Sequence, residues 1–143
     1  VEELLATGAP ASWGVRLNYY PPIQPGGGDD KSGAGRLLGH EDVSMFTMLP
    51  APKGAGLQVL NRQNFKWIEL HKQKGYSHAH RPIILNTGDY MQRISNDVFP
   101  STTHRVSKPM SDAEKGCRRV SFPMNVYLWE QQLLKTPVES DAG

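Results

Sequence analysis

Short apolar runs, each broken after a few residues by Gly, Pro, Asn or Asp, are the feature that most constrains this chain. Such runs are typical of β-strands joined by turns, and they lack the sustained periodicity of long helices. Val15 to Tyr20 alternates and is followed by two prolines, which predicts a strand with a fixed end. Further strands are predicted over residues 42–49, 56–60, 66–70, 82–86, 102–107 and 119–128.

One helix and several loops complete the expected organisation. Residues 89–96 place three apolar side chains at helical spacing, which predicts a short helix. The polar residues 61–64 predict a turn between two strands, and residues 23–39 and 107–116 read as loops. Many short strands with one short helix predict a mainly β protein, a sandwich or jelly roll, in preference to a parallel α/β sheet.

Composition excludes several classes of function. The 143 residues suit a single domain, and the net charge of +2 comes without a Lys/Arg cluster interleaved with aromatics, so no nucleic-acid partner is expected. No apolar run approaches the roughly 20 residues that span a bilayer, so no membrane partner is expected. Cys117 is the only cysteine, which favours a reducing, cytoplasmic location. The glycines at 26–28 lack the flanking strand and Lys-Ser/Thr step of a phosphate loop.

Residues 71–82 differ from their surroundings because they are polar, basic and rich in histidine. Two interpretations stay open for them. The His78-Ala79-His80 stretch has side chains that could bind a metal, but no carboxylate or cysteine partner lies near it in the sequence. We therefore favour a solvated loop insertion.

A second group of histidines carries a stronger metal signal. His40 and Asp42 are two residues apart, which on a strand would place both side chains on one face. His104 lies 62 residues after Asp42, behind a polar turn and within a β-branched strand that could return it to the same point. Two histidines and one carboxylate suit iron(II) with open coordination positions. The alternative is that His40 is a loop residue and Asp42 caps a strand.

Arg119 and Ser121 place a guanidinium and a hydroxyl on one face of the last predicted strand. This pair suits a carboxylate ligand, because arginine binds a carboxylate in a bidentate manner and the hydroxyl adds a neutral donor. A surface ion pair is the alternative interpretation of Arg119.

Six motifs, in order along the chain, resemble those of a known protein family. The chain resembles the iron(II)/2-oxoglutarate dioxygenases of the isopenicillin N synthase-like group, from about Val15 to Trp129. That resemblance implies a double-stranded β-helix, the jelly roll, in a partial form with one short helix. The motifs are Leu17-Asn18-Tyr19-Tyr20-Pro21-Pro22, His40-Glu41-Asp42, Gly56-Leu57-Gln58-Val59, Asn86-Thr87-Gly88-Asp89, the segment from Asn96 to Val106, and Arg119-Val120-Ser121.

The resemblance also implies roles for individual residues. Iron(II) is the expected metal, 2-oxoglutarate and O2 the co-substrates, and a small organic molecule the substrate of a hydroxylation or desaturation. Phe46 and Met48, or Tyr127 and Trp129, could line the substrate pocket, although packing in the core is the favoured role for each. The expected iron ligands are His40, Asp42 and His104, and the expected 2-oxoglutarate contacts are Arg119, Ser121, Tyr20 and Asn18.

The expected domain covers residues 11–130, with 71–82 as an insertion, and residues 131–143 form a tail. Relatives in the group carry an N-terminal portion before the first motif, and without it edges and apolar faces should be exposed. Two alternatives stay open. The chain could hold the metal without using 2-oxoglutarate, or it could be a truncated, catalytically silent fragment.

Overall fold

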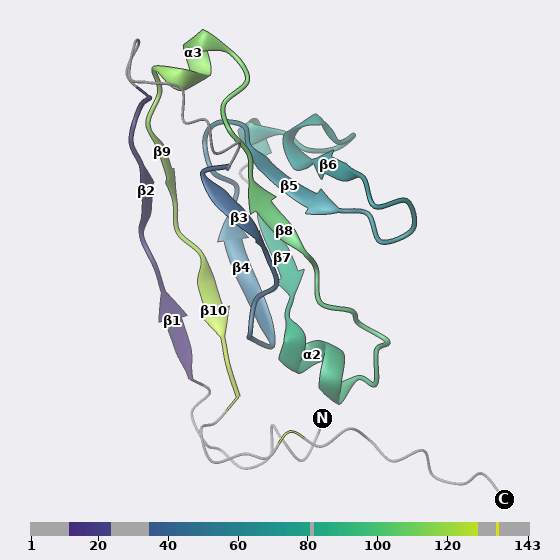
Figure 1. Ribbon diagram of the computed structural model, residues 1–143. Coiled ribbons are helices and arrows are strands. Elements are labelled where there is room, and N and C mark those ends of the chain that lie inside the picture. The colour runs from purple at the N-terminus through teal and green to yellow at the C-terminus, as the bar shows by residue number, and fades with distance from the viewer. Residues whose placement is uncertain (1–11, 24–34, 81, 129–133, 135–143) are drawn as a thin grey trace, which may run out of the picture.

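Ten strands form three antiparallel sheets in the part of the chain that the structure, a computed structural model, describes: residues 12–23, 35–80, 82–128 and 134 (Figure 1). The strands are β1 (Trp13–Val15), β2 (Asn18–Tyr20), β3 (Leu37–His40), β4 (Phe46–Pro50), β5 (Leu57–Leu60), β6 (Trp67–Glu69), β7 (Ile83–Thr87), β8 (His104–Val106), β9 (Arg119–Ser121) and β10 (Met124–Val126). The helices are α2 (Asp89–Ile94) and α3 (Asp112–Lys115), with short 3-10 turns η1 (Leu70–Lys72) and η2 (His78–His80).

Sheet A has the strand order β1-β10-β4-β7, and the two-stranded sheet B, formed by β2 and β9, continues it. In Figure 1, β2 and β9 prolong the direction of β1 and β10. The strand predicted over 119–128 is therefore split between the two sheets, and the strand predicted over 15–20 covers β2 and only the last residue of β1. Pro123 explains the break between β9 and β10, since it has no N–H to donate to a ladder. Its carbonyl still accepts a bond from the Arg16 amide at 3.0 Å, which joins the sheets at the break.

Sheet C has the order β3-β8-β5-β6. Its β5–β6 pair is the hairpin predicted around residues 61–64, and the turn is held because the Asn61 Oδ1 atom accepts a bond from the Gln63 amide at 2.8 Å. The loop prediction over 23–39 was wrong at its end, because β3 begins at Leu37 and runs to His40, whereas residues 24–34 of that stretch lie outside the described residues. Gly56 precedes β5 with a φ of 111°, a conformation that favours glycine.

The antiparallel sheets enclose a cavity of about 770 Å³, which is lined by residues from all three sheets. This mainly β, jelly-roll arrangement confirms the predicted fold class. Helix α2 confirms the predicted helix, with bounds of 89–94 instead of 89–96. The prediction of a single helix was wrong, because α3 occupies the expected loop 107–116. Ser111 and Glu114 form a capping box that begins α3.

Sheet A presents both polar and apolar side chains to the cavity, the apolar ones including Leu49 and Ile84, and mostly apolar side chains outward. Thr47, Asn86 and Asn125 line the cavity, whereas the outward neighbours on the edge strands include Trp13 and Leu85, which are 68% and 65% exposed. Among the described residues, the buried hydrophobic core consists of Ile94 and Val106, which are 8% and 4% exposed. The expected exposure of apolar faces is therefore observed. No helix of the described part is long and apolar enough to cross a membrane.

Candidate functional site

Asp42 lies in the loop between β3 and β4 and not on a strand, since β4 begins only at Phe46. The start of α2 holds this loop in place: the Asp89 amide donates to the Asp42 carbonyl at 2.9 Å, and Tyr90 donates to Ser44 at 3.1 Å. A Cβ atom on Gly88 would overlap both carbonyl oxygens. Only glycine therefore lets α2 approach the loop this closely.

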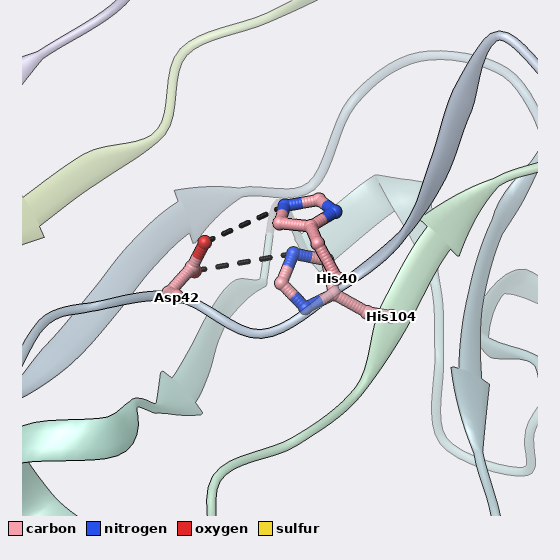
Figure 2. A group of neighbouring side chains, drawn as sticks. All are labelled: His40, Asp42 and His104. Carbon is pink, nitrogen blue, oxygen red and sulfur yellow. Dashed lines mark ion pairs between the residues drawn. The ribbon is translucent and has the colours of Figure 1, made fainter.

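His40 and His104 face each other across neighbouring strands. They are Cα partners in the β3–β8 ladder, and their ring centroids are 4.3 Å apart. The Nε2 atom of His40 lies 3.6 Å from Asp42 Oδ1, and that of His104 lies 3.9 Å from Asp42 Oδ2. Figure 2 shows the three side chains converging. The three residues grouped in the sequence analysis thus lie together, but Asp42 converges through the loop and not through the predicted strand alternation.

The two imidazoles are oriented by main-chain carbonyls. The Nδ1 atom of His40 bonds to the Leu38 carbonyl at 2.9 Å, and that of His104 bonds to the Thr102 carbonyl at 3.0 Å. A carbonyl can only accept, so each Nδ1 carries the proton and each Nε2 keeps a free lone pair. One ligand atom from each of the three residues lies within 4.8 Å of the others. Two neutral imidazoles and one carboxylate at this spacing fit a divalent transition metal such as iron(II).

Three polar side chains that the sequence analysis did not single out as site residues surround Asp42. Thr47 donates its hydroxyl to Asp42 Oδ2 at 2.7 Å, and Asn86 donates its amide to the same oxygen at 3.0 Å. Asn125 donates to the Thr47 hydroxyl at 2.7 Å. Thr47 and Asn125 each stand alone between apolar neighbours in their strands, such as Phe46 and Met48 around Thr47. That isolated polarity was the available signal, because it marks the cavity face of an otherwise apolar strand.

The second predicted group forms two adjacent cross-strand pairs in sheet B. Tyr20 is the partner of Arg119, and Asn18 is the partner of Ser121. The guanidinium of Arg119 lies 5.3 Å from the Tyr20 ring centroid, and its Nη1 lies 3.5 Å from the Ser121 hydroxyl. All four residues line the same cavity.

Arg119 is a buried cation. It is only 3% exposed, and no carboxylate of the described residues forms an ion pair with it. Its buried Nε has no hydrogen-bond partner. Burial lowers the pKa of Arg119, and Tyr20 opposes that change. A buried guanidinium without a carboxylate beside it fits an anionic ligand, which would supply the missing charge.

The cavity joins the two groups, because its walls include His40, Asp42, His104 and all four residues of the Arg119 group. Only some of the residues that could line the substrate pocket do line the cavity. Tyr127 lines the cavity, whereas Phe46 and Met48 do not, since Thr47 and Leu49 alternate with them and take the cavity face. Trp129 lies outside the described residues.

The histidine-rich segment 71–82 forms no second metal group in the described part of the chain, where the one cluster of three ligand side chains is that of His40. The His78 side chain lies outside the described residues. The segment is not wholly solvated either. Burial raises the pKa of Tyr76, and the charge of Arg119 opposes the rise.

Known proteins resemble this chain in sequence and in fold. The profile of the 2OG-Fe(II) oxygenase superfamily matches residues 14–125. A 2-oxoglutarate-Fe(II) type oxidoreductase (ppzC) of Metarhizium rileyi is 35% identical over 116 residues, which cover 76% of this chain and 27% of the relative. Among solved structures, a candidate oxygenase from Shewanella oneidensis is 33% identical with a TM-score of 0.67, covering 84% of this chain and 40% of that one.

A third similar protein was solved with ligands. JOX2, whose structure contains 2OG, Fe and JA, is 26% identical with a TM-score of 0.71, and the match covers 96% of this chain and 36% of JOX2. The chain thus spans between a quarter and two fifths of the length of these three proteins.

Proposed function

The chain belongs to the 2OG-Fe(II) oxygenase superfamily, and from that premise we propose that it is the metal- and co-substrate-binding part of a dioxygenase that oxidises a small organic molecule. The observation that carries the proposal is the single cavity that holds both the His40, Asp42 and His104 group and the buried Arg119. The ordered motifs support the finer assignment to the isopenicillin N synthase-like group. A cytoplasmic location and a domain boundary at 11–130 belong to the same proposal.

The three converging side chains would hold iron(II). When bound, the metal couples the oxidative decarboxylation of 2-oxoglutarate by O2, giving succinate and CO2, to a two-electron oxidation of the substrate. The imidazoles would keep their Nε2 lone pairs on the metal because the Leu38 and Thr102 carbonyls hold the Nδ1 protons.

The Arg119 group would orient the co-substrate. Arg119 would pair with the distal carboxylate of 2-oxoglutarate, and Ser121 and Tyr20 would add hydroxyl donors to it. Asn18, the cross-strand partner of Ser121, would contribute a polar wall. An ion pair in this buried position also replaces the water that would otherwise solvate the guanidinium, so the bound co-substrate would keep that end of the cavity dry.

Anaerobic titration with iron(II) and 2-oxoglutarate tests the proposal. A weak visible charge-transfer band should appear only when both are present. It should vanish in His104→Ala and persist in His80→Ala, which removes an exposed histidine outside the site.

The other outcomes separate the alternatives. Iron binding without the band would favour a relative that holds the metal and does not use 2-oxoglutarate. No iron binding by the folded chain would overturn the enzyme proposal and favour a silent fragment.

A further inference from the structure

A row of polar side chains crosses three strands of sheet A and ends at Asp42. Asn125 on β10 is the Cα partner of Thr47 on β4, and Thr47 is the partner of Asn86 on β7. Thr47 and Asn125 are buried, with 5% and 9% of their surfaces exposed. Buried polar side chains in a strand are destabilising unless they are bonded to one another, so the geometry of this row is tightly constrained.

The direction of each hydrogen bond in the row follows from the donor chemistry. The Asn125 Nδ2 atom can only donate, so Thr47 Oγ1 accepts from it at 2.7 Å. That bond occupies a lone pair of the hydroxyl and leaves its proton free to point at Asp42 Oδ2, 2.7 Å away. Chained bonds of this kind polarise one another and strengthen the last one.

Asp42 is thereby made asymmetric. Its Oδ2 atom accepts from both Thr47 and Asn86, at 2.7 and 3.0 Å. Each oxygen faces one imidazole, since Oδ1 lies 3.6 Å from His40 Nε2 and Oδ2 lies 3.9 Å from His104 Nε2, but the Thr47 and Asn86 donors both bond to Oδ2. All the donors are neutral, so the carboxylate keeps its full charge for a cation. Because Oδ2 already accepts two hydrogen bonds, Oδ1 is the oxygen that remains available as a strong metal ligand.

We propose that Thr47 and Asn86, with Asn125 acting through Thr47, are positioning residues that fix Asp42 as a ligand through one oxygen. This inference rests on the proposed function, since it needs His40, Asp42 and His104 to bind a metal. It gives the polar side chains on the cavity face of sheet A a role in metal affinity.

Iron(II) affinity measured anaerobically by calorimetry on the full chain tests the role of Thr47. Thr47→Val keeps the shape of the side chain and removes the hydroxyl, so iron affinity should fall by about 10–100-fold, the usual effect of losing an outer partner of a ligand. Thr47→Ser should restore the affinity to within about threefold of wild type. The matched control is Thr87→Val on β7, which removes a hydroxyl bonded to the Pro100 carbonyl at 2.7 Å, and it should bind as wild type does.

A double-mutant cycle tests the relay from Asn125. Asn125→Leu should weaken iron binding less than Thr47→Val does. The double variant should be no weaker than Thr47→Val alone, because Asn125 acts only through that hydroxyl. Additive effects would overturn the relay.

The outcomes distinguish this inference from the proposed function. If wild type binds no iron, the proposed function fails. If wild type binds iron and a folded Thr47→Val binds it equally well, the positioning role fails. Should Thr47→Val not fold, Asn86→Ala removes the second donor to the same oxygen, and unchanged iron affinity in that folded variant would refute the inference in the same way.

Discussion

Arg119 and the residues of the candidate metal site differ in how fully their polar atoms are hydrogen-bonded. The metal-site imidazoles and Asp42 are oriented by hydrogen bonds, whereas the Arg119 guanidinium is buried beside the Tyr20 ring and the Ser121 hydroxyl, the latter at 3.5 Å. An anion therefore improves the electrostatics of Arg119 more than those of any residue at the metal site. The two ends of the cavity should respond to ligands independently.

At the residue scale, Arg119→Gln should lower the affinity for 2-oxoglutarate by about 10–100-fold, because a charge-assisted hydrogen-bonded pair contributes about 1.5–3 kcal/mol. Iron(II) affinity should stay unchanged, because Arg119 belongs to the other group. Calorimetry with each ligand in turn checks both expectations. Ser121→Ala should have a smaller effect, and equal losses of iron and 2-oxoglutarate binding would contradict the division.

Most of the candidate site was accessible from the sequence. His40, Asp42, His104 and Arg119 were identified from residue type and spacing, and all of them line the cavity. The row from Asn125 to Asn86 was not, because its function depends on cross-strand register. The strand register pairs Thr47 with Asn86, 39 residues later, and with Asn125, 78 residues later. No local sequence pattern encodes these pairings.

At the scale of elements, α2 does more than connect two strands, since its first turn holds the loop that carries Asp42. Gly88→Ala should push α2 away from that loop, because the new Cβ would overlap the Asp42 and Ser44 carbonyls. We expect a loss of roughly 2–4 kcal/mol in the free energy of unfolding, typical of overpacking and broken backbone bonds together. Denaturant unfolding measures it, and iron affinity should fall in the same variant.

A helix substitution on the far side of α2 provides the control. Arg93→Ala changes an exposed residue in the same helix and should alter stability by no more than about 0.5 kcal/mol. If Gly88→Ala were as mild as this, the close approach of α2 to the Asp42 loop would not stabilise the site.

Element positions were predicted better than element ends. Five strands and α2 lie where the apolar runs placed them, but the run at 119–128 proved to be two strands, and the run at 15–20 contains β2 and only the end of β1. Both breaks lie where the chain passes from sheet A to sheet B, a change that alternation alone does not reveal. Helix α3 was missed because it is four residues long and depends on the Ser111 capping box, which contains no apolar periodicity.

At the scale of the whole molecule, the outward face of sheet A exposes apolar side chains that favour association. Trp13, Val15, Ile83 and Leu85, on its two edge strands, are all more than half exposed. Side chains of this kind on one sheet face favour association or the binding of an apolar dye. The cavity face of the same sheet is separate from them because strand side chains alternate.

Leu85→Thr should therefore reduce dye binding and concentration-dependent association while leaving iron affinity intact. Threonine keeps the β-propensity of the position, so the strand itself should be unaffected. Fluorescence of the dye and light scattering measure the two effects. Phe65→Ser, which changes an isolated exposed residue at the β5–β6 turn, should alter neither as strongly, and an equal response would locate the apolar surface elsewhere.

The hydrogen bonds of His40 and His104 to main-chain carbonyls have a consequence for how this site can change over generations. No substitution of another residue can delete a carbonyl, so the orientation of both imidazoles survives most sequence drift nearby. Asp42 has no such protection, because the partners of its outer oxygen are side chains that one codon change can remove. Natural variation and engineering would thus change metal affinity through the partners of the Asp42 carboxylate, while the orientation of the two imidazoles stays the same.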